Sequence, residues 1–120
     1  MIEARRILIV EDEMIVALFI EDLLDELGHK VAGTVSRLDE AIARADNVDF
    51  DLAILDVHLQ GKEVFPFAEL LAAKGVPFVF ATGYGERGIP ERLRSAPTLQ
   101  KPFRPEELAD MIVKLTAPKA

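Results

Sequence analysis

Residues 52–56, with the sequence LAILD, constrain the fold more than any other stretch, because four apolar residues lead directly into one carboxylate. A strand without alternating polar positions is buried on both faces, which is typical of parallel sheets covered by helices on both sides. The stretches at 6–10, 30–35 and 78–81, and a shorter one around Leu99, are interpreted as further strands. Asp56 therefore either marks an ordinary turn or is delivered by its strand to a site.

Segments with helical periodicity alternate with these strands. Gly28 suits the C-terminal cap of the first helix, and Ser36 with Asp39 resembles a capping box that opens a second helix, through residue 45. Further helices are predicted at 64–74, about 90–94 and 105–115. Five strands that alternate with five helices predict a doubly wound α/β fold. The apolar residues that recur at helical spacing in the first helix are Val16, Ile20, Leu23, Leu24 and Leu27.

The segment from Gly83 to Pro97 combines three glycines and two prolines. Glycine increases backbone freedom and proline limits helix length. Few apolar residues are available to hold this segment against the core, so we expect it to be the most mobile part of the domain and to order on activation.

The overall composition narrows the function classes. The 120 residues, half of them hydrophobic, suffice for one domain over 1–120, with its folded part at about 5–115. A net charge of −7 disfavours nucleic acid as a partner, because a phosphate backbone attracts basic faces. The absence of cysteine excludes disulfides and thiolate metal sites. No apolar run suits a signal peptide or a membrane span, so we expect a cytoplasmic protein with no membrane partner.

Polar residues follow four different strands, at the edge where parallel sheets bind ligands. Glu11 and Asp12 follow the first strand, Asp56 the third, Thr82 the fourth and Lys101 the fifth. Three converging carboxylates suit a hard cation such as Mg²⁺, and an ammonium with a hydroxyl suits a tetrahedral anion. The set predicts phosphoryl transfer, with Asp56 as the acceptor. Taken alone, each residue also fits an ordinary role in a helix terminus, a turn or solvent.

Four motifs carry a resemblance to a known family: ILIVEDE, LAILDVHLQG, FATGY and LQKPF. In order and spacing they resemble the receiver domain of two-component response regulators, over about residues 5–115. The stretch PFVFATGY, at 77–84, further resembles the single-domain FAT GUY subgroup. The resemblance implies a flavodoxin-like (CheY-like) five-stranded parallel sheet flanked by helices, with strand order 2-1-3-4-5.

The resemblance also implies roles for the metal-binding residues. Asp56 would accept a phosphoryl group from a phosphohistidine on a sensor kinase. Asp12 and Asp56 would bind Mg²⁺ directly, the backbone carbonyl of His58 would complete the protein ligands, and Glu11 would act through water. The His58 side chain itself is not expected to be a ligand, because it has no histidine or cysteine partner nearby. His29, which follows the cap glycine, is interpreted as an ordinary surface residue.

Phosphate binding and switching are assigned to other residues by the same resemblance. Lys101 would pair with the phosphoryl oxygens and Thr82 would donate a hydrogen bond to them, while a cis Lys101–Pro102 peptide would aim the lysine into the site. The chain departs from most receivers at Thr98, where they carry an aromatic switch residue; the FAT GUY subgroup shares this gap. The candidate modulators are Gly83, Tyr84 and Pro102.

The implied function is that of a signalling module, which catalyses only its own phosphorylation and dephosphorylation. No DNA-binding segment follows Leu115, so we expect output through contact with another protein or through phosphorelay. One alternative is an aspartyl-phosphate phosphatase, but such enzymes usually need a second acid two residues after the nucleophile, where this chain has His58. The other is a pseudo-receiver that binds partners without phosphorylation, against which the complete set of site residues weighs.

The first helix is the expected docking site for the kinase. Met14, Ile15 and Leu18 lie at i, i+1 and i+4, on the side of the helix away from its apolar stripe and near the acidic residues. A donor histidine must approach Asp56, and receivers of this family use the first helix for such contacts. The alternative is that these three are scattered surface apolar residues, which are common.

Overall fold

Five parallel strands form the middle layer of the fold within residues 4–83 and 87–116, which are the residues that this computed structural model describes. Their order across the sheet is β2-β1-β3-β6-β7, which confirms the doubly wound arrangement and the order 2-1-3-4-5. β3 therefore lies in the centre of the sheet. The strands are β1 (Arg6–Val10), β2 (Lys30–Val35), β3 (Leu52–Asp56), β6 (Phe78–Thr82) and β7 (Thr98–Gln100).

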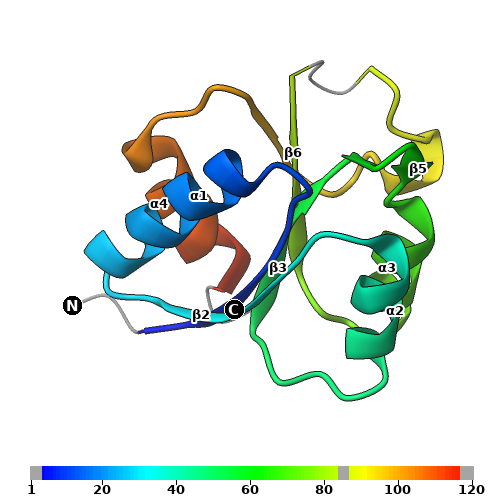
Figure 1. Cartoon of the computed structure of the whole chain (residues 1–120), viewed down its shortest axis with the longest axis horizontal. Coiled ribbons are helices and arrows are strands. Elements are labelled where there is room, and N and C mark those ends of the chain that lie inside the picture. Colours follow the sequence, from blue (N-terminus) through cyan, green and yellow to red (C-terminus); the bar gives the residue numbers. More distant parts are fainter. Residues whose placement is uncertain (1–3, 84–86, 117–120) are drawn as a thin grey trace.

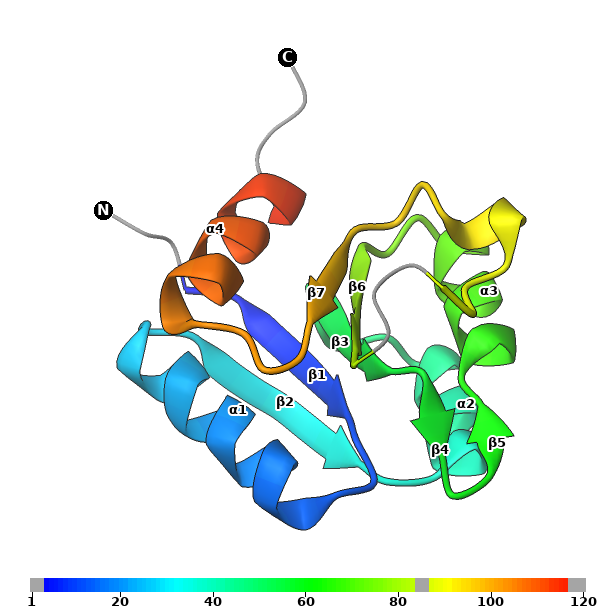
Figure 2. The same cartoon turned by 90° about the horizontal axis from the view of Figure 1, so that it is seen from above.

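Helices cover both faces of this sheet (Figures 1 and 2). α1 (Met14–Glu26) and α4 (Pro105–Thr116) lie on one face, and α2 (Leu38–Ala45) and α3 (Phe65–Ala73) lie on the other. In the part of the chain that the structure describes, no helix combines the length and the apolar character needed to cross a membrane.

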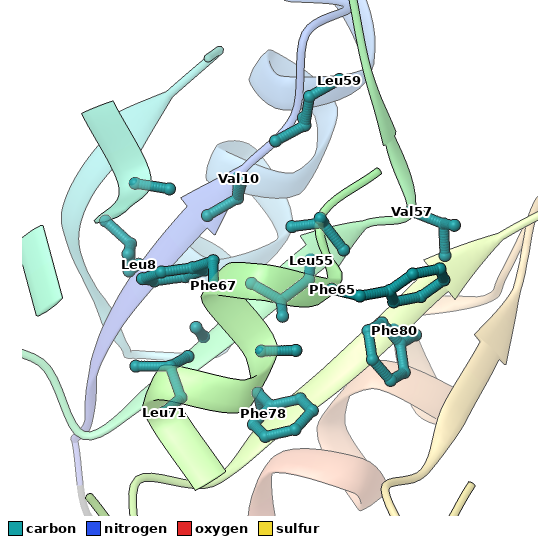
Figure 3. Packing of buried hydrophobic residues seen from close by; sticks show 14 of the residues in the cluster. Leu8, Val10, Leu55, Val57, Leu59, Phe65, Phe67, Leu71, Phe78 and Phe80 are labelled. Atoms are coloured by element: carbon teal, nitrogen blue, oxygen red, sulfur yellow. The ribbon is translucent and has the colours of Figure 1, made fainter. Parts of the chain in front are cut away.

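Each face of the sheet has its own hydrophobic core. Ile7 and Ile9 of β1 belong to the core beneath α1 and α4, whereas Leu8 and Val10 belong to the core beneath α2 and α3. In the second core, two further phenylalanine rings contact the ring of Phe80 edge-on (Figure 3). Burying one such side chain stabilises a fold by about 1.5–3 kcal/mol. Burial on both faces is the physical reason for the continuous apolar runs in the sequence.

The connection between β6 and β7 differs from the sequence-based prediction. In place of an α-helix it contains a three-residue 3₁₀ helix, η1 (Glu91–Leu93), which follows an extended Pro90. Ile89 and Leu93 are buried in the core, so the described part of this segment has two apolar anchors. These two residues are the few apolar contacts that the sequence offered, and the mobility expected of the segment stays a prediction; residues 84–86 lie outside the described residues.

A short β-hairpin, which the sequence analysis did not predict, follows β3. It pairs β4 (His58–Leu59) with β5 (Lys62–Glu63) in antiparallel orientation. Both residues of its turn have positive φ, 49° for Gln60 and 83° for Gly61. Positive φ at both central residues is the signature of the type I′ turn, whose twist matches that of the flanking strands.

The C-terminus of α1 confirms one prediction and corrects another. Gly28 has a φ of +86° and caps the helix, with N–H bonds from Gly28 to the Asp25 carbonyl and from His29 to the Leu24 carbonyl. His29 is buried, however, and not a surface residue. Its Nδ1 accepts the backbone N–H of Arg5 at 3.0 Å, and burial together with the charge of Arg5 lowers the pKa of His29.

The predicted capping box at the start of α2 is absent. The helix begins one residue after an extended Arg37, which occupies the N-cap position without a side-chain capping bond. The Asp39 carboxylate instead accepts hydrogen bonds from the Arg37 guanidinium and from the N–H of Glu40. Because this carboxylate is engaged locally, it does not reach back to Ser36.

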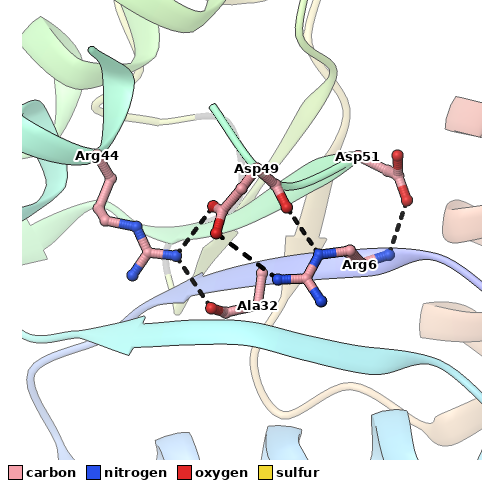
Figure 4. A network of polar contacts seen from close by, with 5 residues as sticks. All are labelled: Arg6, Ala32, Arg44, Asp49 and Asp51. Carbon is pink, nitrogen blue, oxygen red and sulfur yellow. Dashed lines mark hydrogen bonds and ion pairs between the residues drawn. The ribbon is translucent and has the colours of Figure 1, made fainter. Parts of the chain in front are cut away.

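An ion-pair network joins β1, β2 and the end of α2 at the edge of the sheet opposite to the strands' carboxyl ends (Figure 4). The Arg44 guanidinium donates to the Ala32 carbonyl at 3.0 Å and to Asp49 Oδ1 at 3.2 Å. Arg6 donates to the Asp49 carbonyl at 2.8 Å. A shift of register between β1 and β2 coincides with Ala32. Arg44 therefore satisfies a carbonyl at an irregular point of the ladder.

Gly33→Ala should destabilise the domain by about 1 kcal/mol, because a Cβ at this position would lie 2.5 Å from the Arg44 guanidinium. The flexible arginine would swing away and lose its bonds to Ala32 and Asp49, which are worth about 1 kcal/mol in a partly exposed setting. Urea unfolding measures the change. In an Arg44→Ala background the same substitution should lower the free energy of unfolding much less. Equal losses of unfolding free energy in both backgrounds would contradict this account.

Candidate functional site

The polar residues singled out in the sequence meet at the carboxyl ends of the strands. Asp56 ends β3 and Thr82 ends β6, while Glu11 and Asp12 directly follow β1 and Lys101 follows β7. An open cavity of about 490 Å³ lies at this edge. It is lined by Asp12, Glu13, Asp56, His58, Thr82, Gly83 and Lys101. Convergence follows from the topology, because parallel strands bring all their carboxyl ends to the same edge.

Three carboxylates form the acidic part of the site. Oxygen atoms of Glu11, Asp12 and Asp56 all lie within 4.8 Å of one another. Glu11 is buried, and one of its oxygens accepts the N–H of Glu13 at 3.2 Å. Asp12 Oδ2 accepts the backbone N–H of Gln60 at 2.9 Å. Crowded carboxylates of this kind are a donor set that suits a hard divalent cation.

One lysine, which follows the edge strand β7, reaches the acidic cluster. Lys101 Nζ donates to Glu11 Oε1 at 2.6 Å and lies 3.6 Å from Asp56 Oδ1. The backbone N–H of Lys101 donates to the Thr82 carbonyl at 2.9 Å, which fixes the chain beside β6. The Lys101–Pro102 peptide is cis, as the resemblance implies. Burial lowers the pKa of Lys101, but the hydrogen bond to Glu11 and the charge of Asp56 outweigh it, and that pKa is raised.

The aspartates of the cluster differ in their affinity for protons. Burial raises the pKa of Asp56 to about 7, as do the hydrogen bond and charge of Glu11, and Lys101 opposes them only in part. Burial also acts to raise the pKa of Asp12, but the N–H of Gln60 and the neighbouring carboxyl groups outweigh it, so that pKa is lowered. Asp12 is therefore anionic near neutral pH, while Asp56 is balanced between its two forms.

Asp56→Asn should stabilise the domain in the absence of divalent cations. The raised pKa means that folded Asp56 holds a proton which the unfolded chain releases, so the stability present below pH 3.8 is lost as the pH rises through about 7. We expect the variant to exceed the parent by about 2 kcal/mol at pH 8, with a smaller difference near pH 4. Urea unfolding with a chelator at both pH values measures this, and equal stabilities at pH 8 would count against it.

The remaining predicted site residues lie around this cavity, at a distance from it or outside the described residues. Gly83 borders it, and the exposed side chain of His58 lies at its rim. Pro102 is exposed, and Thr98 begins β7. Tyr84 lies outside the described residues.

Sequence reasoning missed Gln60, because Gln60-Gly61 is not one of the residue pairs, such as Asn-Gly or Asp-Gly, that indicate a type I′ hairpin.

The apolar patch expected on α1 is present at the surface. The exposed fractions are 76% for Met14, 83% for Ile15 and 51% for Leu18. Phe19, which the sequence analysis did not include, is 48% exposed, and its ring lies 6.4 Å from the ring of Phe103 just after the lysine. Of the predicted core stripe, Ile20, Leu23 and Leu24 are buried, while Val16 and Leu27 are only partly buried.

Comparison with known proteins identifies related chains. Residues 7–113 match the family model described as the response regulator receiver domain. The chain is 30% identical over 109 residues to the transcriptional regulatory protein PdtaR of Mycobacterium tuberculosis, which covers 90% of the chain and 53% of that protein. It is 34% identical over 113 residues to the phyllosphere-induced regulator PhyR of Methylorubrum extorquens, a match that covers 91% of this chain and 42% of that protein. The chain thus spans about half the length of these curated relatives.

A solved structure of similar size is also related. The solution structure of SdrG from Sphingomonas melonis Fr1 has a TM-score of 0.83 and 43% sequence identity. The likeness covers 96% of this chain and 98% of that one.

Proposed function

Because this chain belongs to the response regulator receiver domain family, we propose that it is a phosphorylation-controlled signalling module in which Asp56 accepts a phosphoryl group from a phosphohistidine on a sensor kinase. The observation that carries this proposal is the convergence of Lys101 and three carboxylates at the end of the central strand. An acceptor carboxylate, an acidic cluster and a phosphate clamp are the parts that phosphoryl transfer requires.

The acceptor must be anionic to attack phosphorus. An oxygen of Asp56 forms the new O–P bond as the P–N bond of the donor breaks, and the donor nitrogen keeps the electron pair. The raised pKa of Asp56, about 7, means that positive charge beside it is needed to maintain the carboxylate. Lys101, 3.6 Å away, supplies part of that charge.

Mg²⁺ is the cofactor that we assign to the acidic cluster. Asp12 and Asp56 would hold it together with the backbone carbonyl of His58, and Glu11 would act through water. When bound, it would offset the repulsion between the carboxylates and neutralise charge on the phosphoryl oxygens. The donor set is all oxygen, as Mg²⁺ prefers.

Lys101 and Thr82 are the residues that would hold the transferred group. In the present arrangement Lys101 lies nearer to Glu11 than to Asp56, at 2.6 Å against 3.6 Å. A phosphoryl group on Asp56 would bring new anionic oxygens within reach of the same ammonium. The Lys101 ammonium would then exchange its bond to Glu11 for a bond to the phosphoryl group, beside the buried Thr82. This exchange of partners is the local change that would alter the surface. Gly83 and Pro102 flank these two residues and would modulate the change.

The partners that we propose are proteins. The exposed patch of Met14, Ile15 and Leu18 on α1 would dock the kinase or a phosphotransfer protein. The phosphorylated surface would then contact a downstream protein or pass the phosphoryl group on. The net charge of −7 supports neither nucleic acid nor an anionic membrane as the target.

Incubation with Mg²⁺ and a small acyl or amido phosphate tests this function, with intact mass and released phosphate as the readouts. A receiver gains one lasting phosphoryl group per chain. Steady release of phosphate without accumulation would indicate an aspartyl-phosphate phosphatase instead. Neither gain nor release would indicate a pseudo-receiver that binds its partners without phosphorylation.

A further inference from the structure

The turn of the β4–β5 hairpin carries a backbone conformation that the sequence does not favour. Gln60 is the only non-glycine residue with a positive φ within residues 4–83 and 87–116. Left-handed backbone costs about 1 kcal/mol for a residue with a Cβ, and glycine, asparagine and aspartate are the residues that adopt it most readily. Outliers of this kind concentrate at functional sites, where the surrounding structure holds them in place.

The hairpin holds this conformation from both sides. Leu59, the residue before the turn, is only 1% exposed, so it anchors β4 in the core. At the base of the hairpin the N–H of Val64 donates to the Val57 carbonyl at 2.8 Å. Figure 2 shows the hairpin extending from the end of β3, at the same edge of the sheet as the start of α1 and beside α2 and α3. Gln60 is thus fixed relative to the strand that ends in Asp56.

The consequence of the turn is a hydrogen bond into the acidic cluster. The backbone N–H of Gln60 donates to Asp12 Oδ2 at 2.9 Å, across 48 positions of sequence. A bond from an N–H to an ionised carboxylate is among the stronger hydrogen bonds in proteins. It engages one oxygen of Asp12 and restrains the rotation of the carboxylate, which belongs to the same cluster as Glu11 and Asp56.

We propose that Gln60 is a positioning residue of the acidic site: its left-handed turn aims a backbone N–H at Asp12, and this bond holds the Asp12 carboxylate in the orientation in which it joins the cluster that would bind the cation. The inference rests on the proposed function, because it assigns Mg²⁺ to this cluster. The coupling is reciprocal, so a cation bound at Asp12 stabilises the hairpin turn in return.

Magnesium titration calorimetry of three variants tests the role of the turn. Gln60→Val, β-branched and disfavoured at positive φ, should weaken Mg²⁺ binding on the order of tenfold, the effect of one lost charged hydrogen bond. Gln60→Gly keeps the N–H and adopts the turn readily, so its affinity should stay close to that of the parent. Lys62→Val is the control: it places the same side chain in the same hairpin at negative φ, and loss of its positive charge cannot weaken cation binding.

A second measurement needs neither cation nor a variant of the turn. In ¹H–¹⁵N spectra without Mg²⁺, Asp12→Ala should shift the amide of Gln60 more than those of Gly61 and Lys62, and should speed its hydrogen exchange. An unchanged Gln60 amide, or full Mg²⁺ affinity in Gln60→Val, would overturn the inference. Failure of the parent protein to bind Mg²⁺ would overturn the proposed function instead, and the amide measurement would still decide whether the turn positions Asp12.

Discussion

Asp56→Asn is expected to abolish phosphorylation of this domain by a small acyl phosphate. The asparagine amide keeps the shape of the side chain but lacks the anionic oxygen that attacks phosphorus. The other two carboxylates of the acidic cluster cannot take its place on equal terms. Asp12 is held by the N–H of Gln60, and Glu11 is buried and bonded to Lys101. We therefore expect the gain of mass seen in the parent protein to be absent in the variant.

Controls separate this result from a loss of folding. Asp110→Asn replaces an exposed aspartate of α4 and should label like the parent. Asp56→Asn itself should remain folded, since removing its charge relieves the repulsion within the acidic cluster. If a phosphoryl group persists on Asp56→Asn and maps by mass spectrometry to another residue, the acceptor has been assigned wrongly.

The alternation of strands with helices and the four polar strand ends could be predicted because both depend on local patterns, whereas the order of the strands is implied only by the resemblance to receiver domains. Continuous apolar runs identify strands that are buried on both faces, and parallel topology then gathers their carboxyl ends at one edge. Asp56 and Lys101 lie 45 positions apart in sequence, yet Nζ and Oδ1 are 3.6 Å apart in the fold. The topology makes this contact, and no spacing between the two residues in the sequence could have indicated it.

The features that were missed depend on tertiary contacts. His29 follows a cap glycine and is interpreted from the sequence as a surface residue. In the fold the backbone N–H of Arg5 donates to its Nδ1, and the ring is buried. Gln60 has no intrinsic preference for positive φ, and only the anchored hairpin around it imposes that conformation. The helix expected near Pro90 is a three-residue 3₁₀ turn, and the burial of Ile89 and Leu93 on either side of Pro90 is a tertiary contact that the sequence pattern did not indicate.

The exposed apolar patch on α1 leads to the second prediction, which concerns the rate of phosphotransfer from a kinase to this domain. Ile15 and Leu18 are 83% and 51% exposed, one turn apart on the same helix. The helix begins two residues after Asp12, so an α-helix of the donor that packs on this patch would lie at the rim of the site. Apolar side chains at such a contact are the kind that a partner helix buries in a groove.

Ile15→Asp or Leu18→Asp should therefore slow phosphotransfer from the cognate kinase by on the order of tenfold or more, because each would bury an unpaired charge at the contact. Labelling by a small acyl phosphate, which needs no docking surface, should remain close to that of the parent. Leu70→Asp is the matched control: it changes a 38% exposed leucine on α3, beyond the opposite face of the sheet, and should leave both rates unchanged. Parental transfer rates in both α1 variants would mean that the kinase docks elsewhere.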